Sequence, residues 1–338
     1  MTEANQPTRI TILFGGLNKE RLVSVATAQA LHLALPEAEL WFWDADDQVY
    51  QVRPQTLLNH ARPFEDPFRP DSASLGRLEP ALDQARADHR LLVLGLHGGT
   101  AENGELQAMC EMRGIAFTGS GSASSNLAFD KVAAKRFAAI AGVTIAAGVA
   151  LDELETALAT YGKLIAKPAR DGSSYGLIFV NASQDLVAVR HAAKTEDYVI
   201  EPFVAGVEAT CGVLEQADGS LMALPPIEII PADGGFDYEA KYLATSTQEI
   251  CPGRFSPEIS AAIMADAVKA HRAMSCRGYS RSDFIVSANG PVYLETNTLP
   301  GLTKASLYPK ALAAQGIGFV EFLHGQIALA EKRAAGTY

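Results

Sequence analysis

The chain has 338 residues, 48% of them hydrophobic and 20% charged, which is typical of a globular protein with two or three domains. Its formal net charge of −11 argues against a nucleic acid or an anionic membrane as partner. The sequence contains no run of roughly 18 apolar residues and no apolar signal-peptide core, so we expect a soluble cytoplasmic protein. The four cysteines are widely separated, which argues against a zinc site or a disulfide framework.

The first third of the chain alternates strands and helices. We predict strands at 9–14, 40–43 and 90–96 and a helix at about 23–35, with glycine pairs close behind the first and last strands. The run 90–96 is almost continuously apolar, as expected of a buried parallel strand. The pattern predicts a doubly wound α/β domain at residues 1–113, with its sites beyond the carboxyl ends of the strands.

The pattern changes near Gly114. Residues 114–206 predict a small α+β unit, with helices at 131–141 and 183–193 and strands at 163–168, 177–180 and 198–204. Residues 207–338 predict a third unit, with several strands, a helix at 257–274, a hairpin at 282–296 and a closing helix from about 318.

The predicted hairpin carries the strongest chemical pattern. Asp283, Glu295 and Asn297 are hard oxygen ligands on its two strands, and this set suits Mg²⁺. A three-residue loop at 288–290 would place Asp283 opposite Glu295. A two-residue loop at 289–290, which the dipeptide Asn-Gly favours by itself, would send the two carboxylates to opposite faces. A metal site therefore predicts the three-residue loop or a β-bulge. The open alternative is the polar outer face of an ordinary hairpin.

Two lysines and a glycine-rich loop suggest phosphate binding. An acidic protein needs local cations to bind a nucleotide triphosphate, and Lys131 and Lys167 are candidates. Lys167 ends an apolar run, where a lysine is costly to bury without a partner, whereas Lys131 could also be a solvated helix residue. The loop 172–176 could fold its amides over phosphates, although it is not a Walker A loop.

Together, motifs spread over almost the whole chain resemble the D-alanine–D-alanine ligases of the ATP-grasp superfamily. The matching segments are Phe14-Gly15-Gly16 with Glu20, His97 with Glu102-Asn103-Gly104, Asp130-Lys131, Lys167-Pro168-Ala169, 172–176, Glu201 with Glu208, 237–242, Arg281 with Asp283, and 294–307. The resemblance implies α/β and α+β units, in which an ATP-grasp fold follows an N-terminal doubly wound domain. The family's members are commonly dimers, so a homodimer is expected.

The resemblance also implies the reaction and the roles of site residues. ATP and Mg²⁺ (or Mn²⁺) would be the cofactors, and D-alanine would be the substrate for D-alanyl-D-alanine formation in peptidoglycan synthesis. The implied nucleotide contacts are Lys131, Lys167, Ser174, Glu201, Glu208 and Lys241, and the implied metal ligands are Asp283, Glu295 and Asn297. The implied catalytic residues are Glu20, Ser173, Tyr242, Arg281 and Gly301, and the implied substrate contacts are His97, Glu102, Ser306 and Leu307.

Four positions depart from the family pattern, namely Asn18, Leu22, Ala101 and Asn103. They leave open a divergent ATP-grasp ligase that joins other D- or small amino acids. A nucleotide-binding sensor without turnover is disfavoured because the metal and oxyanion residues are intact. A nicotinamide dehydrogenase is disfavoured because Gly15-Gly16 is not followed by a Gly-x-Gly-x-x-Gly pattern.

Overall fold

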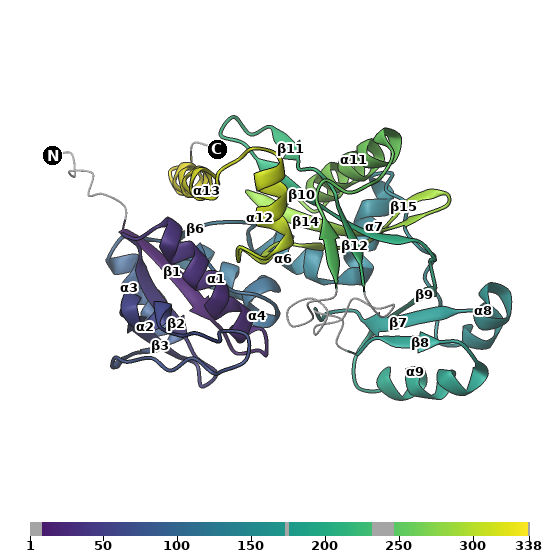
Figure 1. Cartoon of the computed structure of the whole chain (residues 1–338). Coiled ribbons are helices and arrows are strands. Elements are labelled where there is room, and N and C mark those ends of the chain that lie inside the picture. The colour runs from purple at the N-terminus through teal and green to yellow at the C-terminus, as the bar shows by residue number, and fades with distance from the viewer. Residues whose placement is uncertain (1–8, 173–175, 232–246, 337–338) are drawn as a thin grey trace.

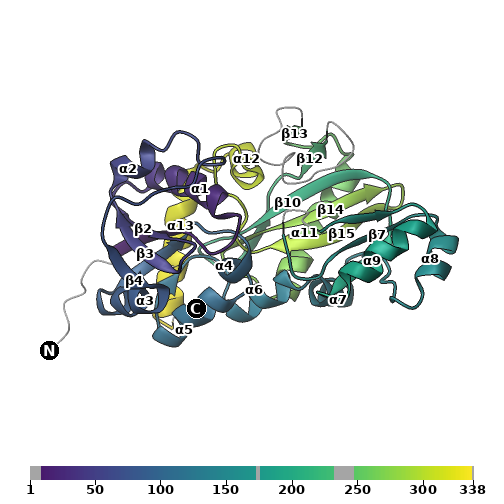
Figure 2. The same cartoon turned by 90° about the horizontal axis from the view of Figure 1, so that it is seen from below.

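The computed structural model describes residues 9–172, 176–231 and 247–336, and within them the strands form three sheets. Figures 1 and 2 show the N-terminal sheet at one end of the molecule, a small sheet at the other, and a large sheet between them. No helix in the described ranges is long and apolar enough to cross a membrane.

The N-terminal sheet has the order β4-β3-β2-β1-β5-β6. Its strands are β1 (Arg9–Gly15), β2 (Glu39–Trp43), β3 (Gln48–Val52), β4 (Ser74–Arg77), β5 (Arg90–Leu94) and β6 (Ala116–Phe117). The helices of this part are α1 (Arg21–Ala34), α2 (Pro54–Leu58), α3 (Leu78–Ala87), α4 (Gly99–Glu102) and α5 (Glu105–Arg113). Strand β6 pairs with β5, so this sheet extends beyond residue 113.

Four adjacent strands of this sheet, β2-β1-β5-β6, are parallel, and β3 and β4 extend it in antiparallel fashion. The turn between β2 and β3 explains the change. The Asp44 carboxylate accepts hydrogen bonds from the backbone N–H groups of Asp46 (2.9 Å) and Gln48 (2.8 Å). Such a tight turn permits only antiparallel pairing. The predicted doubly wound domain therefore has an antiparallel edge.

The large sheet has the order β13-β12-β10-β14-β15, with β11 beside β10. Its strands are β10 (Val207–Glu215), β11 (Leu221–Ala223), β12 (Ile227–Ile230), β13 (Gln248–Ile250), β14 (Tyr279–Ser287) and β15 (Gly290–Asn297). The helices around it are α6 (Ser122–Phe129), α7 (Lys131–Ile140), α11 (Pro257–Ala273), α12 (Leu307–Ala314) and α13 (Phe319–Ala334).

Side chains alternate between the two faces of β10. Ala209, Cys211 and Val213 share a buried cluster with apolar residues of α6, α7 and α11. On the opposite face, a Cβ at Gly212 would lie 2.9 Å from the Tyr308 ring of α12. Helices α6 and α7 therefore complete the core of the large sheet.

The small sheet has the order β8-β7-β9, and both pairings are antiparallel. Its elements are α8 (Leu154–Tyr161), β7 (Leu164–Pro168), β8 (Ile178–Val180), the 3₁₀ turn η1 (Ser183–Asp185), α9 (Leu186–Ala192) and β9 (Tyr198–Pro202). A separate buried cluster, which includes Leu154, Leu164 and Val189, holds this lobe together.

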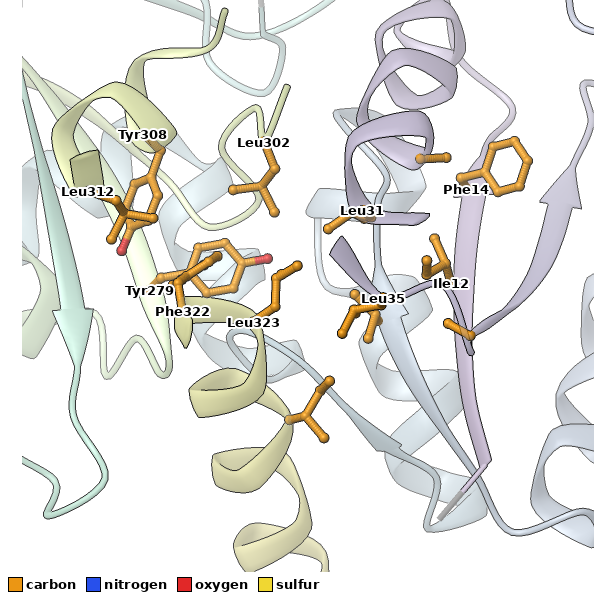
Figure 3. Packing of buried hydrophobic residues seen from close by; sticks show 14 of the residues in the cluster. Ile12, Phe14, Leu31, Leu35, Tyr279, Leu302, Tyr308, Leu312, Phe322 and Leu323 are labelled. Carbon is orange, nitrogen blue, oxygen red and sulfur yellow. The ribbon is translucent and has the colours of Figure 1, made fainter. Parts of the chain in front are cut away.

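One continuous apolar core joins the N-terminal sheet to the large sheet (Figure 3). Leu31 and Leu35 of α1 belong to the same cluster as Tyr279 of β14 and Phe322 of α13. Burial of each large apolar side chain contributes about 1.5–3 kcal/mol. This shared core fixes the N-terminal domain against the large sheet and so fixes the space between them.

Candidate active site

Two pockets adjoin each other between the three sheets. The larger has a volume of about 620 Å³ and is lined by strands of the small and large sheets. The smaller has a volume of about 140 Å³ and lies between the N-terminal domain and the loop that follows β15. Gly172 and Glu295 line both pockets, so the pockets meet at these two residues.

The predicted site residues divide between these pockets. The larger pocket is lined by Lys131, Lys167, Glu201, Glu208, Asp283 and Glu295. The smaller pocket is lined by Glu20, His97, Glu102, Arg281, Glu295, Asn297, Gly301, Ser306 and Leu307. Four other predicted residues lie outside the described part of the chain, namely Ser173, Ser174, Lys241 and Tyr242.

The β14–β15 hairpin confirms the predicted pairing but not the three-residue loop. Asp283 lies opposite Glu295, and Arg281 lies opposite Asn297. At the turn, however, Ser287 pairs with Gly290, so the loop contains only two residues, 288–289. The register shifts between Asp283 and Phe284, which marks a β-bulge at residue 294.

The bulge explains why Tyr293 and Glu295, which are two residues apart on β15, lie on opposite faces of the sheet. Tyr293 is fully buried beside Phe284, with ring centroids 5.9 Å apart. In a regular strand Glu295 would share the face of Tyr293. The extra residue, Leu294, moves Glu295 to the pocket face, opposite Asp283. Bulges often re-aim side chains in this way beside active sites.

Asp283 is held by three side chains. Arg281 donates to both of its carboxylate oxygens at 2.9 Å. The Thr210 hydroxyl donates to Oδ1 at 2.6 Å, and the Asn297 amide donates to Oδ2 at 3.2 Å. Because Asp283 is 8% exposed, these bonds fix its orientation.

Asp283, Glu295 and Asn297 fit a Mg²⁺ ion by their donor chemistry and their place. Two carboxylates and an amide face one another across adjacent strands. The four hydrogen bonds that Asp283 accepts already use both lone pairs of each of its oxygens, so a bound ion would take the place of at least one of these donors. The described residues include no cluster of three or more His, Cys, Asp or Glu side chains suited to a metal. An ion at this place would therefore take further ligands from water or phosphate.

Buried lysines surround the junction of the pockets. Lys131 is 7% exposed, and its ammonium lies 3.3 Å from the Glu295 carboxylate and also donates to the Asp171 carbonyl. Burial, and then the neighbouring Lys135 charge, lower the pKa of Lys167 to about 8. Lys131 is therefore not the solvated helix residue that the sequence left open.

Lys135 was missed by the sequence analysis. It lies one turn after Lys131 on α7, and its ammonium lies 2.7 Å from the Glu201 carboxylate. The i,i+4 spacing places both lysines on one helix face, and this pattern could have indicated Lys135.

The rest of the larger pocket is mainly apolar. Ile165, Phe179 and Phe203 line it from the small sheet side, and the two phenylalanine rings lie 6.2 Å apart. Glu208 lines the pocket from the start of β10. An apolar pocket with a few placed polar or charged groups is typical of a small-molecule or cofactor site.

The smaller pocket is closed on one side by the loop 297–307. The Ser306 hydroxyl bonds to the Thr303 hydroxyl (2.8 Å) and accepts from the Thr303 amide (3.2 Å). A Cβ at Gly301 would lie 2.7 Å from this hydroxyl, so glycine allows the close approach. Leu307 begins α12, and its amide has no partner within the helix. The loop thus offers a hydroxyl and a helix N-terminus to an anion.

His97 and Glu102 fix this loop from the opposite side. Glu102 accepts from the amides of Thr298 (3.0 Å) and Leu299 (3.1 Å). The Leu299 carbonyl lies 2.9 Å from His97 Nδ1, which therefore carries the proton, and Thr27 bonds to Nε2 at 2.8 Å. Burial lowers the pKa of His97 to about 4, so its ring is neutral at pH 7.

Glu20 lies at the start of α1, directly over Gly98. A Cβ at Gly98 would lie 1.7 Å from the Glu20 carboxylate, and Gly98 has a φ of 62°. Asn18, one of the departures from the family pattern, accepts from the Glu20 amide (3.0 Å) and donates to the His97 carbonyl (2.9 Å). Asn18 therefore links the two segments that carry Glu20 and His97.

A small sheet and a large sheet that enclose one pocket, with lysines and carboxylates at its inner end, define the ATP-grasp fold. Residues 9–120 match the family model "D-ala D-ala ligase N-terminus", and residues 149–328 match the model "D-ala D-ala ligase C-terminus". The chain belongs to the D-alanine–D-alanine ligase family.

Individual relatives agree with this family. The chain is 37% identical over 332 residues to the D-alanine–D-alanine ligase of Syntrophobacter fumaroxidans, covering 95% of this chain and 97% of that protein. The VanG D-Ala:D-Ser ligase from Enterococcus faecalis superposes with a TM-score of 0.79 at 28% identity, covering 96% of this chain and 100% of that one. A D-alanine–D-alanine ligase from Bacillus anthracis complexed with ATP gives a TM-score of 0.73 at 26% identity, with coverage of 99% and 100%.

Proposed function

We propose that this protein joins two D-alanines into D-alanyl-D-alanine with conversion of ATP to ADP and phosphate, for peptidoglycan synthesis. The observation that carries the proposal is the junction of the two pockets at Glu295. The larger is big enough for a nucleotide, and the smaller suits amino acids. The names of the relatives, which are D-alanine–D-alanine ligases, support this substrate.

The nucleotide is assigned to the larger pocket. Its phosphates would contact Lys131 and Lys167, together with Ser174 and Lys241 from segments outside the described residues. Glu201 would accept a hydrogen bond from the adenine amine, and Glu208 would accept from the ribose hydroxyls. The support is the gathering of lysines at one end of a mainly apolar pocket in a chain of net charge −11.

The metal is assigned to the junction of the pockets. Asp283, Glu295 and Asn297 would hold Mg²⁺ or Mn²⁺, and the bound ion supplies charge stabilisation for the transferring phosphoryl group. Lys131 holds the Glu295 carboxylate at this junction through its 3.3 Å ion pair.

Two displacements make up the reaction. A carboxylate oxygen of the first D-alanine attacks the terminal phosphorus of ATP, and ADP leaves with the electron pair of the broken P–O bond. The amine of the second D-alanine attacks the acyl carbon and loses a proton, and phosphate leaves with the electron pair of the C–O bond. Exclusion of water protects the acyl phosphate between the two steps.

The residues of the smaller pocket take the substrate roles. Glu20, with Ser173 and Tyr242, would orient the first D-alanine, beside His97 and Glu102. Arg281 and the Gly301 amide would stabilise the tetrahedral oxyanion. The carboxylate of the second D-alanine would lie at Ser306 and the Leu307 amide, where a helix N-terminus favours an anion.

The remaining proposals rest on the sequence and on the family. We propose three structural units, a homodimer and a cytoplasmic location. The first unit extends past residue 113 to include β6, the small lobe ends near residue 206, and α6 and α7 belong with the large sheet although they precede the small lobe in sequence.

Phosphate release from ATP and Mg²⁺, measured with and without D-alanine, tests the proposal. We expect release that depends on D-alanine and yields the dipeptide in equal amount. In Arg281→Met we expect kcat to fall about 10²- to 10³-fold because an oxyanion donor is lost. Arg190→Met, which alters a surface pair with Glu155, is the control and should behave as wild type. Equal phosphate release with and without D-alanine would overturn the proposal.

A further inference from the structure

Lys135 connects the two sheets that wall the larger pocket. It lies on α7 and is 4% exposed. Its ammonium lies 2.7 Å from Oε1 of Glu201, on β9 of the small sheet. The same ammonium donates to the carbonyl of Tyr293, on β15 of the large sheet, at 3.2 Å. One buried cation thus bonds to both walls of the pocket.

The ion pair between Lys135 and Glu201 holds the Glu201 carboxylate in one position. Glu201 is 2% exposed, pairs with Lys135 and is one of the residues that line the larger pocket. Burial of an ionised carboxylate costs several kcal/mol unless a partner compensates it. The Lys135 ammonium supplies that compensation, and its bond to the Tyr293 carbonyl keeps it from turning away.

We propose that Lys135 is a positioning residue that holds Glu201 as an oriented anion, and that the pocket thereby selects a 6-amino purine over a 6-oxo purine. This inference rests on the nucleotide role proposed above for Glu201. A carboxylate only accepts hydrogen bonds, so it pairs with an exocyclic amine and repels a carbonyl oxygen. If Lys135 is removed, the carboxylate loses both its fixed orientation and its compensating charge.

Calorimetric binding of ATP and inosine triphosphate to the full chain, with Mg²⁺ and without D-alanine, tests this inference. Inosine triphosphate carries a carbonyl in place of the amine. We expect wild type to prefer ATP by about 10- to 100-fold, which is the value of one hydrogen bond to a charged group. In Lys135→Met we expect the two affinities to lie within about 3-fold of each other. A purely structural role would weaken both nucleotides equally and leave their ratio unchanged.

Two further variants make the test decisive. Lys269→Met removes an exposed lysine that pairs with Asp266 at 2.8 Å, and it should keep the wild-type ratio. The double variant Lys135→Met/Glu201→Gln leaves no uncompensated buried charge and carries the test if Lys135→Met fails to fold. A glutamine amide can turn to accept from an amine or donate to a carbonyl, so we expect the double variant to bind both nucleotides about equally.

The outcomes separate this inference from the proposed function. Equal binding of the two nucleotides by wild type, or an unchanged preference in either Lys135 variant, overturns the inference. A Lys135-dependent preference without D-alanine-dependent phosphate release would support the inference and overturn the proposed ligase reaction.

Discussion

Lys167 should lower the stability of the protein when no nucleotide is bound, and nucleotide binding should offset this loss. Burial, and then the neighbouring charge of Lys135, lower its pKa from 10.5 to about 8. The folded protein therefore binds this proton less tightly than the unfolded chain does. The resulting penalty is fully present below pH 8 and disappears as the pH rises from 8 to 10.5.

The size of the penalty follows from the two pKa values. A difference of about 2.5 corresponds to about 3.4 kcal/mol. Lys167 keeps partial contact with solvent, and screening reduces this figure to about 1–2 kcal/mol. Methionine has a similar length and no charge, so Lys167→Met should be more stable than wild type by this amount at pH 7, in the absence of ATP. The advantage should vanish near pH 10.5.

In the presence of ATP, wild type should be more stable than Lys167→Met. A ligand at 100 times its Kd stabilises a protein by about 2.7 kcal/mol, and the variant lacks a cation for the phosphates. Urea unfolding at pH 7 and pH 10, with and without ATP and Mg²⁺, measures both effects, and calorimetry measures ATP affinity. Lys163→Met, at an exposed lysine just before β7, is the control. A variant that is less stable than wild type without ATP, or that binds ATP normally, would refute this reasoning.

Four further predictions concern the junction, Glu102 and the reaction product. In Asp283→Asn and Glu295→Gln the Mg²⁺ concentration for half-maximal phosphate release should rise and turnover should fall, because each change removes an anionic ligand. Normal Mg²⁺ dependence in both would place the metal elsewhere. Glu102→Ala should lower stability by about 2–4 kcal/mol in urea unfolding, because it leaves buried amides, including that of Leu299, without an acceptor. Burial, and then the charge of Glu20, raise the pKa of Glu102 to about 7. The stability of Glu102→Gln relative to wild type should therefore increase as the pH rises from about 4.5 to 7. Parallel curves of stability against pH for the two proteins would contradict this. The family resemblance implies that Tyr242 belongs to a dipeptide-forming site, so D-alanyl-D-lactate should be a minor product near pH 7, and its efficient formation would show the assignment to be wrong.

The hairpin shows how far the sequence alone could go. The demand that two carboxylates share one face predicted the pairing of Asp283 with Glu295, and the structure confirms it. The two ways of reaching that pairing, a longer loop or a bulge, were indistinguishable because both restore the same register. The structure has the bulge, because Tyr293 is buried against Phe284, and this is a tertiary contact that the local sequence does not show.

Other parts of the site depend on contacts between distant segments. The family motifs named His97 and Glu102 but did not indicate that both bond to the backbone of Leu299, about 200 residues further along the chain. Lys135 stood one turn from a predicted site residue, but its burial became visible only once β9 and β15 lay on either side of α7. Local periodicity predicts which face a side chain shares, and long-range packing decides what it meets there.

The bulge at Leu294 has a consequence for how related sequences are aligned. Between the turn and the bulge, the ladder pairs Phe284 with Tyr293, and beyond the bulge it pairs Asp283 with Glu295. An insertion in the 288–289 turn leaves both pairs in place, because the ladder below the turn keeps its register. A gap of one residue at Leu294 would turn Glu295 toward the apolar core and empty its place at the junction of the pockets. Length variation among homologues should therefore be common at the tip of this hairpin and absent five residues further on, at Leu294.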